Sequence, residues 1–570
     1  MGLNRLRLQA ILSLQARRRD LPYLCELEYL ESTGEQWIRL NIPLGSTENI
    51  RHETSIMVTQ LGTKQQEGYA VATRWYSITE DGHYTIGSES SKIMASTTSY
   101  DNVVLETINQ NCSLIVNDEV ILTRTSACSS SPDTYLFVAN EHMQNPCYIR
   151  KKYHKFYVDG ALLFDGIPVL DYDMKPAMYD RVTKKLFYNE GTGADFKWAI
   201  KRGDTRAYTK LEYLESTGEQ YIDIGYQLQT TDTVKHVVTQ QYAHKSATQY
   251  ENHVTAPRYF GIDTNSCYTL GGGTVVTMPA SLDSFDKIVF EGTPTQGILT
   301  VNDTLVASRA SNVSRSLNIY IFGACGSSNE LQYPCFVKKK SHQIYVNDLL
   351  IFDGIPVLDY LLRPAMFDRV SGKLFYNEGT GADFKYGLRG TDGNLYTSVP
   401  YIESTGKEII RVNMPITGTQ KVKHVCCQQY VTQEGSQLEG FVETGRAFGT
   451  KDGYYYIASY ASSDVMSSTT DFDKIVFESE VGWQSLTVNG TEILTKRFAD
   501  MKDISGIRLF AAGGNSHVCY LKKKYHLFYL DNKLVFAGVA VIDTKGVAGL
   551  FDIVTKTMFR TNSGQFIVGE

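Results

Sequence analysis

The stretch LFYNEGTGADFK at residues 186–197 returns letter for letter at residues 374–385, and a diverged version, MFRTNSGQF, lies at residues 558–566. A second motif precedes it each time. LEYLESTGEQ at residues 27–36 recurs at 211–220, and a shortened form, YIESTGKE, lies at 401–408. The same start and end therefore occur three times in one order. We expect the glycines of the end motif to supply the unusual dihedral angles of a turn between two strands.

The spacing of these motifs predicts three whole domains. The ESTG segments begin at Glu31, Glu215 and Glu403, and intervals of this length far exceed the roughly 20–50 residues of a solenoid repeat. A chain of 570 residues is also too long for one hydrophobic core. We predict an N-terminal segment at 1–24, then domains at 25–204, 205–394 and 395–570. We call these three regions the first, second and third copy.

Each copy has the pattern of strands joined by tight turns. Asn117-Asp118 lies between two apolar runs, and pairs of this kind favour two-residue hairpins because Asn, Asp and Gly tolerate positive φ. A second hairpin is expected about forty residues later, and then a turn in which an aspartate bonds the backbone ahead of it. The equivalent turns are Asn302-Asp303 and Asn489-Gly490; Asp159-Gly160, Asn347-Asp348 and Asp531-Asn532; and those at Asp180, Asp368 and Asp552. The predicted fold is all-β, with three tandem jelly-roll β-sandwich domains after a short N-terminal helix.

Composition and charge exclude some functions. The net charge of -6 gives no support to a nucleic-acid surface or an anionic-membrane surface. No run of about 18 apolar residues occurs, so no membrane span is predicted. Three cysteines occupy one equivalent position (Cys147, Cys335 and Cys519), but no second cysteine recurs to pair with them. We therefore expect buried thiols in a reducing compartment, and neither disulfides nor structural zinc.

The first twenty residues have a basic, amphipathic character. The apolar spacing predicts a short helix, and the arginines follow the apolar part, whereas a secretion signal carries its charge before it. A frayed helix, a docking peptide for a larger assembly and an Arg-rich transit peptide all fit this pattern. The candidate docking residues are Leu3, Leu6, Ile11, Leu14, Arg17, Arg18 and Arg19.

A family resemblance rests on four motifs of the second copy, namely LEYLESTGEQYIDIG, VNDT, YVNDLLIFDGIPVLDY and PAMFDRVSGKLFYNEGTGADF. In these the chain resembles the concanavalin A-like, laminin-G-like jelly-roll domains of virion and surface proteins of gut (crAss-like) bacteriophages and their Bacteroidales hosts. The resemblance implies a lectin-type sandwich used as a capsid decoration, head fibre or tail-associated adhesin. It is weaker in the third copy, where FDGIPVLDY becomes FAGVAVIDT.

Catalytic patterns are poorly represented. A glycosidase on this fold needs two carboxylates about 5 to 5.5 Å apart for retention, and the Glu-x-Asp-x-x-Glu strand motif is missing. The best recurrent acids are Asp165 with Asp171 and Asp353 with Asp359, but Ala537 replaces the first member in the third copy. We interpret these acids as flanking a turn at Gly166-Ile167-Pro168. No Gly-x-Ser-x-Gly nucleophile motif occurs.

A basic cluster recurs before the second hairpin of each copy. As a functional site it would bind sulfated or phosphorylated glycans, and as a structural feature it would place solvated charges on a strand. Consecutive lysines on a strand point to opposite faces, so they cannot all line one groove. The candidate anionic-glycan contacts are Lys151, Lys152, Lys339, Lys340, Lys523 and Lys524.

Together with the missing catalytic patterns, the resemblance implies a non-enzymatic structural protein of a bacteriophage virion. It would be made in the host bacterial cytoplasm and attach to other virion proteins through its N-terminal segment. Its partners would be capsid or tail proteins and cell-surface or mucin glycans, with no nucleic acid and no cofactor; homo-oligomer formation is left open. A bacterial surface adhesin and a glycan-active hydrolase are the alternatives.

Overall fold

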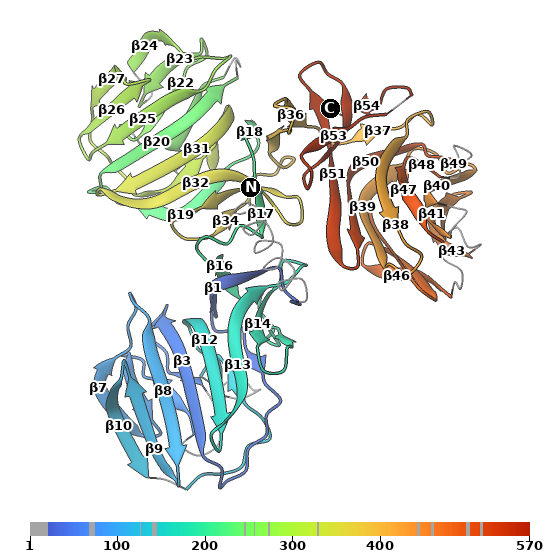
Figure 1. Ribbon diagram of the computed structural model, residues 1–570. Coiled ribbons are helices and arrows are strands. Elements are labelled where there is room, and N and C mark those ends of the chain that lie inside the picture. The colour runs from blue at the N-terminus through green and yellow to red at the C-terminus, as the bar shows by residue number, and fades with distance from the viewer. Residues whose placement is uncertain are drawn as a thin grey trace, which may run out of the picture. The chain divides into compact units, whose positions relative to one another are not determined.

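The computed structural model describes residues 21–67, 74–125, 127–139, 145–243, 247–255, 257–271, 274–327, 330–441, 445–457, 461–497, 502–512, 517–561 and 563–569. Every helix or strand within these ranges is a β-strand (Figure 1). The all-β prediction is therefore confirmed. The predicted N-terminal helix, with the docking residues Leu3 to Arg19, lies outside the described residues.

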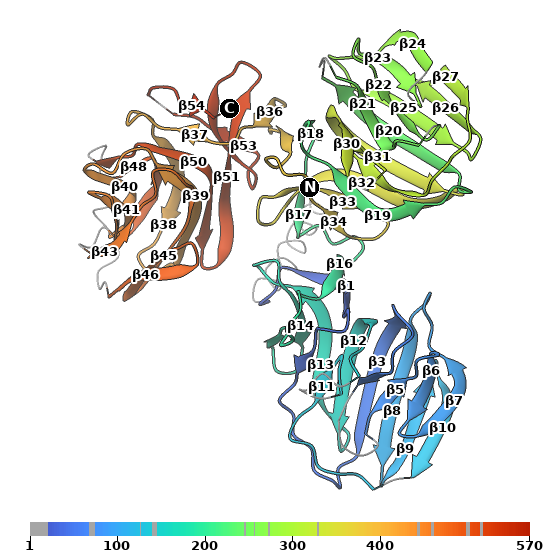
Figure 2. The same cartoon turned by 180° about the vertical axis from the view of Figure 1, so that it is seen from behind.

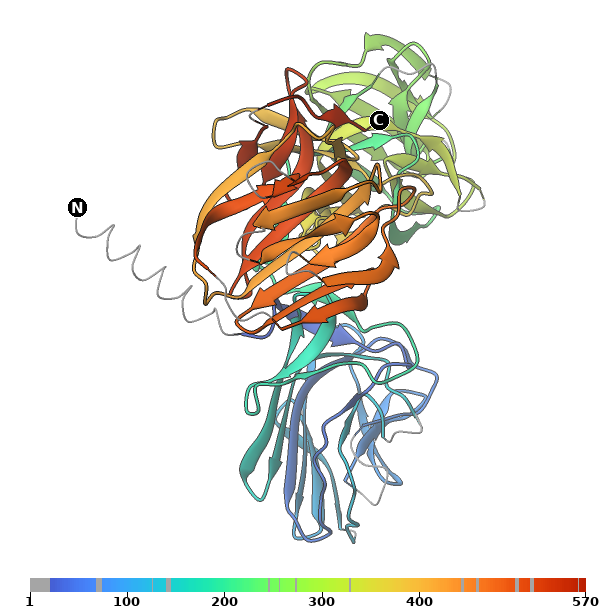
Figure 3. The same ribbon diagram turned by 90° about the vertical axis from the view of Figure 1, so that its right-hand side faces the viewer.

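The described residues pack into two compact units, those within 1–209 together with 343–376, and those within 210–342 together with 377–570. In the first unit a large sheet has the order β10-β9-β8-β3-β12-β1-β13-β14-β15, with β16 beside β1, and β4 to β7 form a second sheet (Figure 2). The chain passes from β3 in the large sheet through the whole second sheet before it returns in β8. This crossing between two sheets makes a jelly-roll sandwich, whose two layers are visible in Figure 3.

The strands of the first copy are β1 (Cys25–Glu31), β2 (Ile38–Arg39), β3 (Ile50–Val58), β4 (Gln65–Glu67), β5 (Tyr76–Ile78), β6 (His83–Ile86), β7 (Glu89–Met94), β8 (Asp101–Ile108), β9 (Asn111–Val116), β10 (Glu119–Thr125), β11 (Tyr135–Leu136), β12 (Ile149–Val158), β13 (Ala161–Leu170), β14 (Pro176–Asp180), β15 (Leu186–Phe187) and β16 (Lys197–Ile200).

The strands of the second copy are β17 (Tyr208–Lys210), β18 (Tyr213–Thr217), β19 (Ile222–Leu228), β20 (Val234–Tyr242), β21 (Gln249–His253), β22 (Tyr259–Ile262), β23 (Cys267–Leu270), β24 (Thr274–Pro279), β25 (Asp286–Gly292), β26 (Gln296–Val301), β27 (Thr304–Ala310), β28 (Leu317–Ile321), β29 (Gly323–Cys325), β30 (Leu331–Pro334), β31 (Phe336–Val346), β32 (Leu349–Asp359), β33 (Pro364–Asp368), β34 (Leu374–Phe375), β35 (Lys385–Arg389) and β36 (Leu395–Ser398).

The strands of the third copy are β37 (Ile402–Glu403), β38 (Ile410–Ile416), β39 (Val422–Tyr430), β40 (Ser436–Phe441), β41 (Arg446–Lys451), β42 (Tyr454–Ile457), β43 (Ala461–Met466), β44 (Asp473–Glu480), β45 (Trp483–Val488), β46 (Thr491–Lys496), β47 (Ile504–Leu509), β48 (Ala511–Ala512), β49 (His517–Val518), β50 (Leu521–Leu530), β51 (Lys533–Asp543), β52 (Ala548–Asp552), β53 (Thr557–Phe559) and β54 (Ile567–Val568).

The second unit repeats the pairings of the first. β20 pairs with β25, β25 with β26 and β26 with β27, and β39 pairs with β44 and β50 in the same antiparallel way. The four-stranded sheet β40-β41-β42-β43 corresponds to β4 to β7. The pair β21 and β29 departs from the expected antiparallel pattern, because these two strands run parallel. Phe477, Phe528 and Phe536 lie at the centre of the third copy's core.

The two-residue hairpin turns are confirmed. Asn117 and Asp118 have φ of 50° and 69°, the left-handed values that such turns require. The same holds at Asn302 and Asp303, Asn489 and Gly490, Asp159 and Gly160, Asn347 and Asp348, and Asp531 and Asn532. The aspartate turns are also confirmed. The Asp180 carboxylate accepts the backbone N–H groups of Val182 and Thr183, both at 3.0 Å.

The closing turn of the first copy differs from its predicted form. Gly191 and Gly193 do not have positive φ, so unusual dihedral angles do not explain them. A Cβ on Gly191 would lie 1.9 Å from the Glu35 carbonyl oxygen, and one on Gly193 would meet the Glu35 side chain. Close approach of two backbone segments therefore requires these glycines. Asn189 accepts the N–H groups of Gly191 and Trp37, which ties the end motif to the start motif.

Candidate functional site

A buried ion pair forms at the same place in each copy. Lys151 Nζ lies 2.8 Å from Glu67 Oε2, and the equivalent pairs, Lys339 with Glu251 and Lys523 with Glu439, are both separated by 2.9 Å. All six side chains are at most 1% exposed. The prediction that Lys151, Lys339 and Lys523 contact a glycan is therefore wrong. These side chains point into the sandwich, and an uncompensated charge there would be costly.

Each buried glutamate also holds a phenylalanine in a left-handed backbone conformation. Phe137, Phe322 and Phe510 have φ of 67°, 68° and 66°. Their N–H groups donate to Glu67, Glu251 and Glu439 at 2.8, 3.0 and 2.7 Å. Their rings lie 5.3 to 5.4 Å from the lysine Nζ atoms. A bulky residue seldom adopts this conformation, and here it directs one more donor at the buried carboxylate.

A pair of histidines completes this buried centre. His52 Nδ1 lies 3.1 Å from His154 Nε2, and the equivalent pairs, His236 with His342 and His424 with His526, are 2.8 Å apart. Burial, chiefly, lowers the pKa of His52, His236 and His424 to about 3. These histidines are therefore neutral in the folded state at neutral pH. The sequence signal for this pair is the histidine that recurs at the third position of β3, β20 and β39, which was not among the predicted site residues.

The recurrent cysteines are buried thiols, as the sequence predicted. Cys147 Sγ donates to the Gln66 carbonyl oxygen at 3.2 Å, and Cys335 and Cys519 make the equivalent bonds to Tyr250 and Leu438. Burial raises the pKa of these thiols well above the usual value. A protonated, enclosed thiol is a poor nucleophile, so these cysteines serve the core.

One group of potential metal ligands occurs within the described part of the chain. Atoms of Cys426, Glu439 and His526 lie within 4.8 Å of one another. The first and second copies carry Thr54 and Val238 in place of Cys426. The Lys523 ammonium already bonds Glu439 and lies 3.4 Å from His526 Nδ1. A cation would have to compete with this ammonium, so we assign the group to the buried centre.

The outer face of the same strands presents a second recurrent arrangement, which we call the basic–aromatic patch. Because side chains alternate along a strand, the residues on either side of each buried lysine point outward. Lys152, Lys340 and Lys524 lie over the rings of Tyr100, Phe285 and Phe472, with Nζ 4.1, 4.1 and 4.3 Å from the centroids. Arg150, Lys338 and Lys522 lie over Tyr29, Tyr213 and Tyr401 at 4.6, 5.2 and 5.0 Å.

The patches differ in how far their charge is neutralised. In the first copy Glu28 pairs with Lys152 at 2.8 Å, and Glu31 pairs with Arg150 at 2.6 Å. The third copy has Pro400 in place of Glu28. Among the residues that the structure describes, no ion pair involves Lys524. The third patch therefore presents more uncompensated positive charge than the first.

The acids that a hydrolase would use are engaged elsewhere. Asp165 pairs with Arg181 at 2.8 Å, and Asp171 accepts a hydrogen bond from the Tyr188 hydroxyl at 2.9 Å. In the second copy Asp353 pairs with Arg369, and Asp359 pairs with Arg363 and accepts from Tyr376. Asp171 accepts the N–H groups of Asp173 and Lys175 in the turn that follows β13. Asp165, however, lies inside β13, as Asp353 lies inside β32. The interpretation that the paired acids flank a turn is therefore wrong, because Gly166-Ile167-Pro168 belongs to a continuous strand that pairs with β14.

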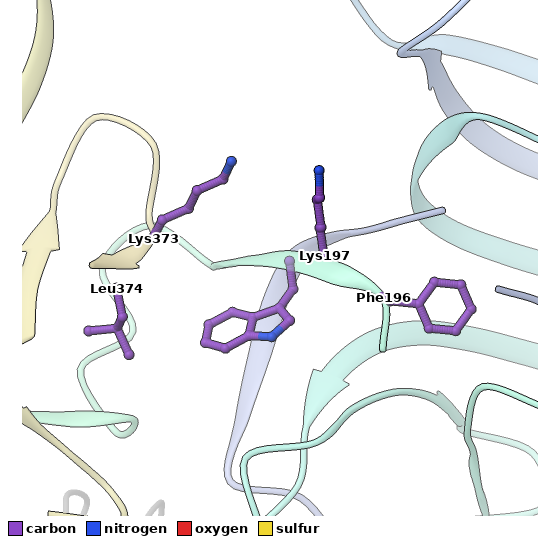
Figure 4. A pocket seen from close by; sticks show the side chains of 5 residues that line it. Phe196, Lys197, Lys373 and Leu374 are labelled. Carbon is purple, nitrogen blue, oxygen red and sulfur yellow. The ribbon is translucent and has the colours of Figure 1, made fainter. Parts of the chain in front are cut away.

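A further pocket in the first unit is lined by Phe196, Lys197, Trp198, Lys373 and Leu374. Lys197 and Lys373 extend toward the same open side (Figure 4). Burial, chiefly, lowers the pKa of Lys373. The third copy has Ile567 and Val568 where the first has Lys197 and Trp198, so this pocket is not a shared property of the copies.

Comparison with solved structures finds laminin G domains among the similar proteins. No family model and no curated protein matches the sequence. The LG1-3 region of the laminin alpha2 chain is 9% identical, with 89% of this chain and 96% of that chain covered and a TM-score of 0.21. Domains LG4-5 of the mouse laminin alpha1 chain are 12% identical, with 58% and 93% covered and a TM-score of 0.24. Similarity at these TM-scores carries no argument, so the fold assignment rests on the strand order and pairing.

No helix long and apolar enough to cross a membrane occurs in the described ranges of the chain.

Proposed function

We propose that this chain is a non-enzymatic bacteriophage virion protein whose sandwiches bind anionic glycans through the basic–aromatic patches. The observation that carries the glycan part is the threefold recurrence of a cation over a half-buried ring on an outward face. An ammonium group can bond sulfate, phosphate or carboxylate, and an exposed ring edge or face can pack against the apolar side of a sugar. Neither feature is needed by the core, where the intervening lysine is already paired.

The virion part of the proposal is supported by the motif resemblance, and the attachment to capsid or tail proteins is assigned to the N-terminal segment.

Three sandwiches in one chain also offer three weak glycan-binding sites. Linked sites raise the overall affinity because the second binding event becomes intramolecular. Individually weak cation contacts at exposed positions can therefore give useful binding to a repetitive polymer.

A binding experiment tests the glycan proposal. The triple variant Lys152→Ala, Lys340→Ala and Lys524→Ala is compared with wild type on an immobilised sulfated polysaccharide and on its desulfated form. We expect the variant to lose roughly tenfold or more in affinity, because about 0.5 to 1 kcal/mol is lost at each site. Binding should also weaken as salt rises.

The matched control removes the same charge without removing a cation–ring pair. Lys155, Lys287 and Lys423 lie on the same outward faces and are ion-paired with Glu53, Asp303 and Glu478. Their triple alanine variant should bind within about threefold of wild type. Equal losses of affinity in both triple variants would show that binding depends on net charge and not on the cation–ring pairs. Equal binding to the desulfated polymer would contradict anion recognition.

The virion and non-enzymatic parts need separate tests. Mass spectrometry of purified phage particles should find this protein, and its absence from the particles would overturn the virion proposal. Recovery of the protein on host cells that carry no phage would favour a bacterial surface adhesin. Release of sugar from polysaccharides incubated with the protein would favour a hydrolase.

A further inference from the structure

In the second and third copies the buried lysine contacts a glutamine as well as the glutamate. Lys339 Nζ donates to Gln240 Oε1 and lies 2.9 Å from Glu251 Oε1. Lys523 Nζ donates to Gln428 Oε1 and lies 2.9 Å from Glu439 Oε2. All six residues are fully buried. An amine, a carboxamide and a carboxylate are therefore held together out of contact with water.

The strand register brings these groups together. Gln428 on β39 lies directly opposite Lys523 on β50, and directly opposed side chains on neighbouring strands point to the same face. The ring of Phe510 closes one side, 5.4 Å from Lys523 Nζ, and Phe322 lies 5.3 Å from Lys339 Nζ. Reactants fixed at hydrogen-bonding distance in an apolar site have a high effective concentration.

We propose that Lys339 with Gln240, and Lys523 with Gln428, form intramolecular isopeptide bonds, with Glu251 and Glu439 transferring the protons. These bonds would covalently join β20 to β31 and β39 to β50. They would be internal modifications of the folded chain, and they do not depend on the proposed glycan binding.

The reaction balances without an added reagent. The lysine ammonium first gives a proton to the glutamate, and the free amine attacks the side-chain carbonyl carbon of the glutamine, forming the new C–N bond. The protonated glutamate then delivers its proton to the amide nitrogen, which leaves as ammonia when the original C–N bond breaks. The released ammonia takes up the second proton that the amine loses and leaves the site as ammonium. The glutamate ends as the carboxylate that it was at the start.

The first copy supplies a natural negative control. Ile56 occupies the position of Gln240 and Gln428, so no carboxamide faces the lysine there. Lys151 Nζ instead contacts Glu67 and the Thr54 hydroxyl, the latter at 3.0 Å. The same buried lysine and glutamate are therefore present without the group that would be attacked, and no bond is expected in this copy.

Intact mass spectrometry of the purified full chain tests the proposal. Each bond removes one ammonia, about 17 Da, so the expected mass is about 34 Da below that of the sequence. Proteolysis and tandem mass spectrometry should yield one branched peptide that joins Gln240 to Lys339 and another that joins Gln428 to Lys523. Denaturant and reductant should leave both bonds intact. A full-sequence mass without branched peptides would overturn the proposal, and this measurement needs no variant.

Two variants separate the role of the glutamate from general packing. Glu439→Gln should abolish the third-copy bond and leave the second-copy bond, so the mass difference from the sequence falls to about 17 Da. Glu478→Gln, a partly exposed carboxylate on β44 in the same copy, should retain both bonds. If Glu439→Gln still forms the third-copy bond, the assigned proton transfer is wrong. If that variant fails to fold, as judged by protease sensitivity, Lys151 peptides of the wild type still provide the unbonded comparison.

Discussion

Replacing Lys151 by methionine is expected to destabilise the first copy by about 3 to 5 kcal/mol. The Glu67 carboxylate is 1% exposed, and among the described residues it would keep only the Tyr76 hydroxyl at 2.6 Å and the Phe137 N–H at 2.8 Å. Breaking a buried ion pair by removing one partner costs this amount because it leaves an uncompensated charge. That is a large share of the roughly 5 to 15 kcal/mol that stabilises a typical domain. The first copy is the right one to test, since Ile56 excludes any cross-link there.

Hydrogen exchange on the full chain measures this effect locally. Amides of β12 should exchange roughly a hundredfold to a few thousandfold faster in Lys151→Met than in wild type, because each 1.4 kcal/mol is a factor of ten. Amides of β50 in the third copy provide an internal control and should not change. Lys152→Met, one residue away but half-exposed, should change the opening free energy that hydrogen exchange reports for β12 by less than about 1 kcal/mol.

The double variant Lys151→Met with Glu67→Gln tests the physical cause. A neutral glutamine can still accept the Phe137 N–H, so most of the lost stability should return. In wild type, burial raises the pKa of Glu67, but Lys151 and the hydrogen bonds outweigh burial and hold the pKa below its usual value. A cost below about 1 kcal/mol in the single variant, or no recovery in the double variant, would refute the assignment of a strong buried pair.

Three further perturbations follow from the buried groups. The buried histidines, such as His52 with a pKa of about 3, have folded-state pKa values below the unfolded value of about 6.5, so the unfolded chain takes up protons first as the pH falls. The free energy of unfolding should therefore decline by about 1.4 kcal/mol per pH unit per histidine below pH 6.5. A denaturation midpoint that stays constant between pH 6.5 and 5 would contradict this. Arg446 is buried and donates to the carbonyl oxygens of Thr417, Gly418 and Gln420 at 3.0 to 3.1 Å. Arg446→Met should therefore destabilise the third copy by about 3 kcal/mol or more and speed hydrogen exchange in residues 417–420. Unchanged exchange in these residues would show that Arg446 does not hold this segment in place. Gly191→Ala should destabilise the first copy by at least about 1 to 3 kcal/mol because its Cβ would overlap the Glu35 backbone; Gly45→Ala, whose Cβ would find only ordinary contacts at 3.5 Å and beyond, is the control, and equal thermal midpoints of the two variants would show that the closing turn adjusts.

Local chemistry made several elements predictable from the sequence. The turns at Asn117-Asp118 and Asp159-Gly160 depend on φ preferences of two residues, and the Asp180 turn depends on a side chain reaching residues two and three positions ahead. The alternation of side chains along β12 likewise follows from the backbone alone. These features need no knowledge of the rest of the chain, and the repeats displayed each of them three times.

The face that each lysine occupies was decided by the tertiary structure. In the sequence Lys151 and Lys152 are equally plausible surface residues, because a lysine is seldom buried without a partner. The partner, Glu67, is 84 residues away and comes from the second sheet, so only the packing of two sheets reveals it. The His52 and His154 pair, 102 residues apart, was hidden for the same reason.

The sequence by itself determined that this protein is a threefold repeat of β-strands and tight turns, because turn and strand preferences are local. The tertiary structure alone decided which of its charges are buried, paired and placed beside an amide, and which remain over aromatic rings at the surface. The physical reason is that the cost of burying a charge depends on the groups that surround it. In this fold those groups come from strands far apart in the chain.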